Sequence, residues 1–347
     1  MKTISTILCS MFFLVFTPVT LHAQENVFLS WGFWKNATAA DVQAEIERGS
    51  DIKDTFHEED CLPQICNNGW TPLHYAVRYN HSPESVRVLI EHGVHIDAKT
   101  DYGQTPLHWA ADYNEEPAIV KLLLDHGADI EARNRWGSTP LHGAVEKNKS
   151  AVIKALLERG ADIEARDKHG TTPFLGAVGF NGRPDVLKLL IEYGADIEAR
   201  DGKGRSALHW AAVRDDVLMA VPIDEAIVLK NIELLLDHGM DINVRDNPEN
   251  ATPLLWAAVR SKSPAVLELL LNRGADMEIR GGAFGHTPLL TAARLTSNPA
   301  IVETLLRGGA DATAQDEFGR TAFELAKENE SLKDTKAYWL LNEAQYR

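Results

Sequence analysis

Two groups of residues in this chain have side chains that could bind a metal ion: a close pair of cysteines and a series of regularly spaced histidines. Cys61 and Cys66 are separated by four residues, and His57 lies shortly before them. Thiolate and imidazole are the ligands that zinc prefers, but a tetrahedral structural site needs four of them. In an oxidising compartment, an even number of cysteines favours a disulfide. We predict a Cys61–Cys66 disulfide, with a metal site at this pair as the alternative.

The histidines follow a Thr or Ser by three residues, in the phrase Thr-Pro-Leu-His or a close variant. Adjacent helices pack about 8–10 Å apart, so histidines on successive helices cannot reach one zinc ion with nitrogen ligands at about 2 Å. Other copies of the phrase carry Leu or Glu at this position. We therefore predict no metal site here and expect each histidine to hydrogen-bond beside its own Thr or Ser. These residues are His74, His108, His142 and His209.

The phrase around each histidine belongs to a repeat that covers most of the chain. Its successive starting positions are separated by 33–35 residues, apart from one spacing of 46. A period in this range is typical of a stack of small, similar modules that bury their apolar faces on one another. The copies begin at Thr71, Thr105, Thr139, Thr172, Ser206, Thr252, Thr287 and Thr321.

Each repeat contains its own helix start and stop residues. Thr followed by Pro is typical of a helix N-terminus, and a second apolar run with helical spacing follows. That run ends at a glycine suited to a left-handed C-terminal stop. A short segment such as "ADIEARD" then leads to another glycine, which predicts a tight turn. The helix-stop glycines are Gly93, Gly127, Gly160, Gly194, Gly239 and Gly274.

The segment Asp101–Arg133, "DYGQTPLHWAA…PAIVKLLLDHGADIEAR", resembles an ankyrin repeat almost position for position. The resemblance covers about Thr38 to Leu341. It implies an all-α solenoid of helix-turn-helix modules with β-hairpin fingers, comprising about seven full repeats and degenerate caps at both ends. The finger tips and first helices would line a concave groove.

The repeat pattern and the chain ends predict four segments. Residues 1–23 read as a signal peptide, because Lys2 precedes an apolar run and Leu21 and Ala23 suit a cleavage site after Ala23. Residues 24–66 form an N-terminal capping repeat with the cysteine-bearing loop, 67–313 the ankyrin repeats, and 314–347 a C-terminal capping repeat. The fifth repeat carries about twelve extra residues within 213–231.

Charge and hydropathy restrict the partners. Lys and Arg total 35 against 50 Asp and Glu, a net charge of −15, which disfavours nucleic acid and anionic membrane surfaces. Beyond the N-terminal run no apolar stretch is long enough to span a membrane. The signal-peptide pattern predicts an exported, periplasmic or secreted protein with no membrane association after cleavage, and the resemblance implies a protein partner. We expect a monomer.

Ankyrin-like arrays vary at the finger tips and late in the first helix, so the resemblance implies that partner-binding residues lie there. Aromatic residues and Arg, which are enriched in binding hot spots, occupy many of these positions. Trp109, Trp210 and Trp256 share a different position, where we expect core packing. The candidate binding residues are Tyr79, Tyr102, Tyr113, Trp136, Phe180, Arg214, Arg260, Phe284, Arg294 and Phe318.

The sequence contains no G-x-S-x-G stretch, P-loop or H-E-x-x-H motif. Acidic pairs such as Asp129 and Glu131 recur with the repeat and so belong to the scaffold. We predict a non-catalytic scaffold without cofactors that binds a protein outside the cytoplasm. Two alternatives stay open: an exported effector that binds a host protein, and a metal-dependent factor or enzyme that uses Cys61 and Cys66.

Overall fold

The computed structural model describes residues 26–55, 69–115, 117–147, 149–212, 224–247, 249–261, 263–282 and 284–346. The chain divides into two compact units. The N-terminal unit comprises Met1–Ala110 and Ala118–Asp129, and the C-terminal unit comprises Ala111–Pro117 and Ile130–Arg347. The predicted signal peptide, Cys61, Cys66, His57 and Arg214 lie outside the described residues.

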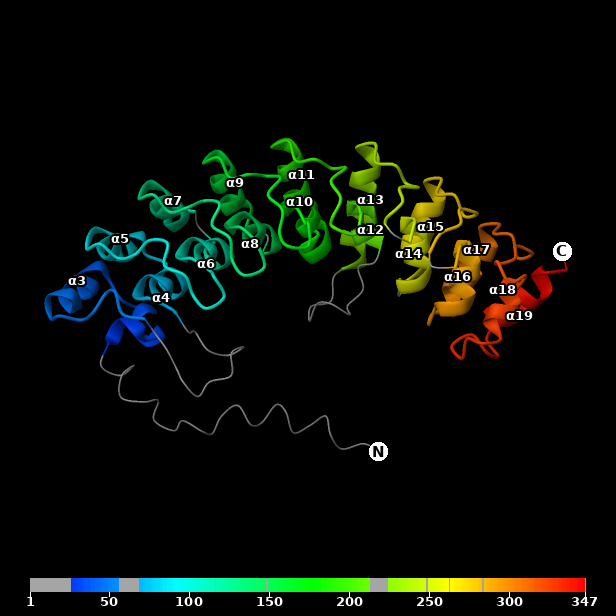
Figure 1. Ribbon diagram of the computed structural model, residues 1–347, viewed down its shortest axis with the longest axis horizontal. Coiled ribbons are helices and arrows are strands. Elements are labelled where there is room, and N and C mark those ends of the chain that lie inside the picture. Colours follow the sequence, from blue (N-terminus) through cyan, green and yellow to red (C-terminus); the bar gives the residue numbers. More distant parts are fainter. Residues whose placement is uncertain are drawn as a thin grey trace, which may run out of the picture. The chain divides into compact units, whose positions relative to one another are not determined.

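The described residues fold into short helices joined by turns (Figure 1). The 3₁₀ segment η1 (Val27–Leu29) comes first, and the π-helical segment η2 (Ala177–Asn181) continues α10. The α-helices are α2 (Trp31–Trp34), α3 (Ala39–Glu47), α4 (Pro72–Tyr79), α5 (Pro83–Glu91), α6 (Pro106–Tyr113), α7 (Ala118–Asp125), α8 (Pro140–Glu146), α9 (Ser150–Glu158), α10 (Pro173–Gly176), α11 (Pro184–Glu192), α12 (Ala207–Ala212), α13 (Glu225–Asp237), α14 (Pro253–Arg260), α15 (Pro264–Asn272), α16 (Pro288–Leu295), α17 (Pro299–Arg307), α18 (Ala322–Ala326) and α19 (Lys336–Ala344).

The helix starts follow the predicted capping chemistry. At α14 the Thr252 hydroxyl accepts a hydrogen bond from the Leu255 backbone N–H at 3.3 Å, and Pro253 occupies the first helical position. Thr287 caps α16 in the same way, through the N–H of Leu290. A backbone N–H in the first turn of a helix needs such an acceptor. Pro has no backbone N–H, so it leaves no donor unsatisfied at this position.

The helix-stop glycines all have the predicted left-handed backbone, with φ between 80° and 91°. At the end of α9, Gly160 has φ 88°, its N–H bonds to Leu157 O, and the Ala161 N–H bonds to Leu156 O. This pair of bonds satisfies carbonyls that would otherwise lack a donor.

In the N-terminal unit, α2 packs against α4 and α3 packs against α5, which in turn packs against α7. Phe28 and Trp34 are fully buried, with ring centroids 5.6 Å apart. The Trp34 indole N–H donates to Phe28 O at 2.8 Å. The Asn80 amide donates to Trp34 O and Ala37 O, which ties the first helices of this unit together.

In the C-terminal unit the helices form two rows (Figure 1). The first helices α8, α10, α12, α14, α16 and α18 pack in succession, as do the second helices α9, α11, α13, α15, α17 and α19. Apolar side chains between the rows, such as Ile153, Leu187 and Leu267, are fully buried. A leucine-sized side chain contributes about 1.5–3 kcal/mol on burial, so mutual burial of neighbouring repeats stabilises the stack.

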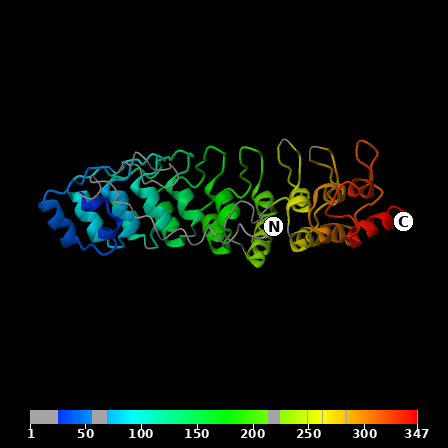
Figure 2. The same cartoon turned by 90° about the horizontal axis from the view of Figure 1, so that it is seen from below.

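Finger loops project from one side of these helices (Figure 2). Each finger closes through a turn: the Asp167 N–H bonds to Thr171 O, and the Gly170 N–H bonds to Asp167 O. In the part of the chain that the structure describes, the only β pairing is two isolated antiparallel bridges, Gly281 with His286 and Gln315 with Thr321.

A ladder of arginines joins neighbouring fingers in the C-terminal unit. Arg166 Nη1 donates to Gly170 O in its own finger at 2.8 Å and to Arg200 O in the next finger at 2.6 Å. The same pair of contacts recurs along the unit, and Gln315 O accepts the last bond. The donors are Arg133, Arg166, Arg200, Arg245 and Arg280.

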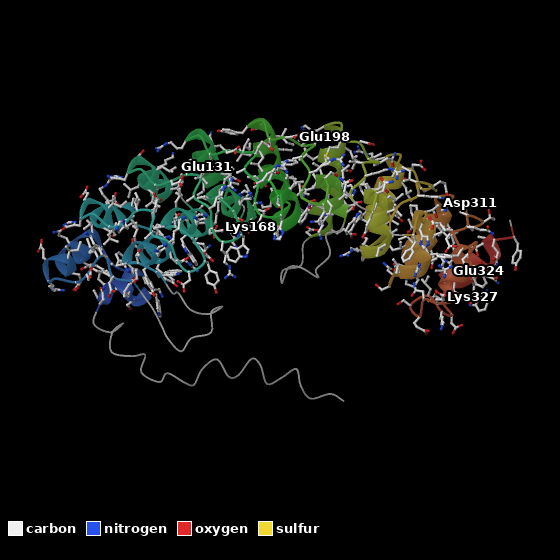
Figure 3. The ribbon with its side chains drawn as sticks, viewed as in Figure 1. Glu131, Lys168, Glu198, Asp311, Glu324 and Lys327 are labelled. Atoms are coloured by element: carbon white, nitrogen blue, oxygen red, sulfur yellow. The ribbon has the colours of Figure 1, made fainter. Side chains whose placement is uncertain are left out.

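Carboxylates make a second connection between fingers. Glu131 Oε1 accepts from the Asp162 backbone N–H at 2.8 Å, and Glu278 Oε1 accepts from the Asp311 N–H at 2.9 Å. Figure 3 labels Glu131 and Asp311 among the side chains of this unit. The recurrent acidic residues of the "ADIEAR" phrase therefore help to fix the register between repeats.

Candidate protein-binding surface

The four repeated histidines hydrogen-bond as predicted. His74 Nδ1 accepts from the Thr71 backbone N–H at 3.1 Å and lies 2.9 Å from the Thr71 hydroxyl. His74 Nε2 lies 3.2 Å from Gln104 O on the next finger, which fits a neutral ring protonated at Nε2. The same own-cap contacts hold His108, His142 and His209. The prediction of a structural role is confirmed.

Burial keeps these rings neutral. Desolvation lowers the pKa of His74 to about 4, against an opposing effect from the hydrogen bond to Gln104 O. Burial likewise lowers the pKa of His142 and His209. Over the described residues, no three His, Cys, Asp or Glu side chains converge as a metal site would require. Within the same ranges, no helix combines the length and apolar composition needed to cross a membrane.

Tyr79 belongs to an aromatic cluster in the N-terminal unit. The Trp70 ring lies 6.3 Å from Tyr79, 5.0 Å from Tyr75 and 4.4 Å from Trp109, measured between centroids. Trp70 and Tyr75 are buried, and Tyr79 and Trp109 are half-buried. Tyr79 therefore packs in this cluster and stays partly accessible, and Tyr102 on the adjacent finger is also half-buried.

Trp136 is an exposed finger-tip residue of the C-terminal unit. Its side chain is 42 % exposed, and the Arg135 guanidinium lies 4.4 Å from the ring centroid. Its backbone carbonyl accepts from the N–H of Lys168, a residue of the next finger that Figure 3 labels. Tyr113, at the end of α6, is half-buried.

Phe180 lies in η2 and packs against Trp210 of the next repeat, with centroids 6.0 Å apart. Trp210 also lies against Gly179, and the Arg205 guanidinium stacks on it, 4.4 Å from the ring centroid. Both rings are half-buried. Trp210 thus packs between repeats as predicted, and Phe180 shares that packing.

A pocket of about 270 Å³ lies between the sixth and seventh repeats. It is bounded by the last turns of α14 and α16 and by the finger between Gly281 and His286. Two predicted binding residues, Arg260 and Phe284, line it. The other lining residues are Glu249, Ala251, Leu255, Trp256, Val259, Gly281, Gly282, His286, Thr291 and Leu295.

Aromatic–arginine stacking orders this pocket. The Arg294 guanidinium lies 4.0 Å from the Phe284 ring centroid, and that of Arg260 lies 5.0 Å from the ring of Trp256. Trp256 is held by a 2.8 Å hydrogen bond from its indole N–H to the buried Asp246 carboxylate. The structure therefore brings three predicted residues, Arg260, Phe284 and Arg294, to one place.

Phe318 is the next finger-tip aromatic and is 72 % exposed. The guanidinium of Arg320 lies 5.2 Å from its ring and also pairs with the buried carboxylate of Asp316 at 2.9 Å. On the other side of Asp316 lies His286, 3.6 Å away. Burial lowers the pKa of His286 more than the Asp316 carboxylate raises it.

Sequence reasoning overlooked Leu295, Trp256 and His286 as parts of the pocket. Leu295 is 51 % exposed at the end of α16, where the preceding Arg294 was already a candidate. An apolar residue at a helix end that faces solvent was the sequence feature that could have identified Leu295. Trp256 was assigned to the core, yet it is half-buried and lines the pocket as well.

Comparisons with known proteins found a family and solved structures that are similar to this chain. The family model described as "Ankyrin repeats (3 copies)" matches residues 44–134, 83–167, 119–201, 141–246, 174–281 and 255–345. The crystal structure described as the ankyrin repeat domain of Bcl-3, a unique member of the IkappaB protein family, is 32 % identical. That match covers 67 % of this chain and 91 % of the other, with a TM-score of 0.49. No curated protein matches the chain significantly.

The family matches run from the third helix to the last, and the described helices repeat with the same period. The fold is an ankyrin repeat solenoid, and proteins of this kind are protein-binding scaffolds that are typically non-enzymatic. The chain belongs to the ankyrin repeat family.

Proposed function

We propose that this protein is a non-catalytic scaffold that binds another protein through its fingers and first helices and acts outside the cytoplasm. One observation supports the proposed binding of another protein. Three finger tips of the C-terminal unit present an exposed aromatic ring stacked on an arginine: Trp136 with Arg135, Phe284 with Arg294, and Phe318 with Arg320.

Exposed aromatic residues and arginines are the side chains that contribute most to protein–protein affinity. A ring held by a guanidinium loses little conformational freedom on binding, because its orientation is already fixed. The three rings occupy the same position of the repeat, directly before the finger-tip glycine, so one extended partner could contact several of them.

Crosslinking capture tests this proposal. The wild-type chain is compared with a triple variant, Trp136→Ala, Phe284→Ala and Phe318→Ala, and with a control, Tyr193→Ala. Tyr193 is also exposed, at 37 %, but it ends the second helix α11 rather than a finger. We expect the same crosslinked protein with the wild type and the control, and its loss with the triple variant. Equal capture by all three would contradict the proposal.

The proposed compartment rests on the sequence of residues 1–23. If the segment is a cleaved signal peptide, the mature protein begins at Gln24 and fractionates with the periplasm or the medium. N-terminal sequencing after cell fractionation measures both. A protein that retains Met1 and stays in the cytosolic fraction would exclude export, whereas binding could still be tested by the capture experiment.

A further inference from the structure

The pocket between the sixth and seventh repeats has apolar walls that reach the surface. Phe284 is 40 % and Leu295 is 51 % exposed, and both line the pocket together with Val259 and the Trp256 ring. Its volume of about 270 Å³ is below the roughly 300–1,000 Å³ of sites that enclose whole small molecules. The size and the walls therefore suit one large apolar side chain.

The arginines at this pocket differ from other arginines of the same unit. Arg205 and Arg320 each pair with a buried finger aspartate, Asp201 and Asp316, at 2.6 and 2.9 Å. Among the described residues, no carboxylate lies within ion-pair distance of Arg260 or Arg294; their recorded partners are aromatic rings.

One polar atom of the arginine stacked on Phe284 is buried without a hydrogen-bond partner. It is Nη1 of Arg294, whereas Nε2 of His286 lies 3.6 Å from the buried Asp316 carboxylate inside the protein. Leaving such groups unsatisfied is unfavourable, and stable proteins contain few of them. Arg294 and Arg260 are thus two guanidinium groups at this pocket without a carboxylate partner among the described residues, so the pocket carries positive charge that nothing in this part of the chain neutralises.

We propose that this pocket binds a segment of a partner protein in which an Asp or Glu stands next to a large apolar residue. The apolar side chain enters between Phe284, Trp256 and Leu295, and the carboxylate pairs with the exposed guanidinium of Arg260. Arg294 positions Phe284 by stacking beneath it. The inference rests on the proposed protein-binding function and assigns the chemistry of one contact.

The distribution of charge on the protein supports an acidic segment as the occupant of the pocket. The whole chain carries a net charge of −15, so an acidic segment is attracted only where cations gather without neutralising partners. Glu249 lines the pocket, but over the described residues no ion pair joins it to Arg260 or Arg294. A basic segment would leave both arginines unpaired and repel them.

Selection from phage-displayed random peptides on the purified full chain tests the proposal. Enriched peptides are synthesised with a fluorophore and with either an amidated or a free C-terminus, and the affinity of both forms is measured by fluorescence anisotropy. We expect Asp or Glu beside Leu, Ile, Phe or Trp. Arg260→Glu and, separately, Leu295→Asp should each weaken binding about tenfold or more. Replacing the peptide carboxylate by Lys should restore part of the affinity for Arg260→Glu.

A matched control is Arg273→Glu, which makes the same change in charge at an exposed residue of the second-helix row that pairs with Asp237. It should bind like the wild type, and circular dichroism should show that every variant folds. Enrichment of peptides without an acidic residue, or equal affinity for wild type and Arg260→Glu, would overturn the inference. So would peptides that bind only with a free C-terminal carboxylate. Peptides that lose binding with Trp136→Ala but not with Arg260→Glu would overturn it while supporting the proposed function.

Discussion

A Cβ atom at Gly179 would lie 2.4 Å from Cε3 of Trp210, so the ring of one repeat occupies the space where the preceding repeat has no side chain. Real Cβ atoms do not approach a ring this closely, and the guanidinium of Arg205 also stacks on Trp210, 4.4 Å from its centroid. The glycine in η2 is therefore part of the packing between the fourth and fifth repeats.

Gly179→Ala should lower the free energy of unfolding by about 1–3 kcal/mol, because the added methyl group forces Trp210 out of its position. Gly176→Ala, three residues earlier, is the matched control. Its nearest contact would be Phe180 at 3.8 Å, so the higher helix propensity of Ala should leave stability unchanged or raise it by up to about 1 kcal/mol. Urea unfolding followed by circular dichroism measures both. Equal effects of the two substitutions would show that the ring moves without cost.

Stability should fall as the pH is lowered from about 6.5 to about 4, because His74 is buried as the neutral form. Its folded pKa of about 4 lies below the ordinary value of 6.5, so the unfolded chain binds a proton more readily over this range. For His74 alone the loss amounts to roughly 3 kcal/mol once the pH is below both values. Burial lowers the pKa of His142 and His209 in the same direction.

Unfolding free energies at pH 7 and pH 5 test this dependence. His74→Leu, which places the residue of the fourth, sixth and seventh repeats at this position, should reduce the difference between the two pH values. His238→Leu, at an exposed helix end, should keep the wild-type difference. An unchanged pH dependence in His74→Leu would mean that other groups cause it.

Arg166→Lys should lower the free energy of unfolding by about 1 kcal/mol, although it keeps the charge. A lysine ammonium cannot donate to Gly170 O and Arg200 O with the geometry of the planar guanidinium. Arg273→Lys is the control, since Arg273 forms an exposed ion pair with Asp237, and such pairs contribute little. If both variants unfold at the same urea concentration as the wild type, the ladder adds no net stability.

Gly127→Val should lower the free energy of unfolding of the N-terminal unit by about 1–3 kcal/mol. The backbone at Gly127 has φ 87°, which a β-branched residue rarely adopts, while nothing lies within 4 Å of a Cβ atom there. The cost is therefore conformational rather than steric crowding. Gly127→Asn is the control and should cost less, because Asn tolerates the left-handed region. Thermal unfolding should rank the wild type above Asn and Asn above Val.

The mature chain should contain no free thiol and no stoichiometric metal ion. Cys61 and Cys66 would be its only cysteines after cleavage at Ala23, and an oxidising compartment favours their disulfide. Intact mass after alkylation under non-reducing conditions and elemental analysis provide the measurement. A bound metal that disappears in Cys61→Ser would instead support the metal-dependent alternative.

The helices and their ends were predictable because their determinants are local. Thr-Pro helix starts and glycine helix stops act within a few residues. The helix boundaries of each repeat can therefore be predicted from its own sequence, as at Thr252 and Gly160. The roles of His74 and its equivalents also followed from spacing alone. The fingers were recognisable by their glycines, as the left-handed backbone at Gly137 and Gly170 confirms.

The pocket could not be predicted in the same way. It forms where the finger between Gly281 and His286 meets α14 of the preceding repeat, and its walls depend on how Phe284 stacks on Arg294 and how Trp256 bonds to Asp246. The arginines of the ladder recur in the sequence phrase "IEAR". A recurring exposed arginine is equally consistent with a side chain that is only solvated, so the phrase alone does not predict the ladder. Only the distance from Arg166 Nη1 to Arg200 O shows that it connects two fingers.

The direction of the arginine ladder makes the two ends of the C-terminal unit inequivalent. Every guanidinium donates to the backbone of the repeat that follows it, and the series stops at Gln315, which only accepts. Shortening the array from its carboxyl end would strand a cation without its carbonyl, whereas shortening it from the amino end would merely release a carbonyl to water. The order of the repeats therefore has a direction, set by arginine donors and backbone acceptors. Loss of a repeat from the amino end should destabilise the unit less than loss of a repeat from the carboxyl end.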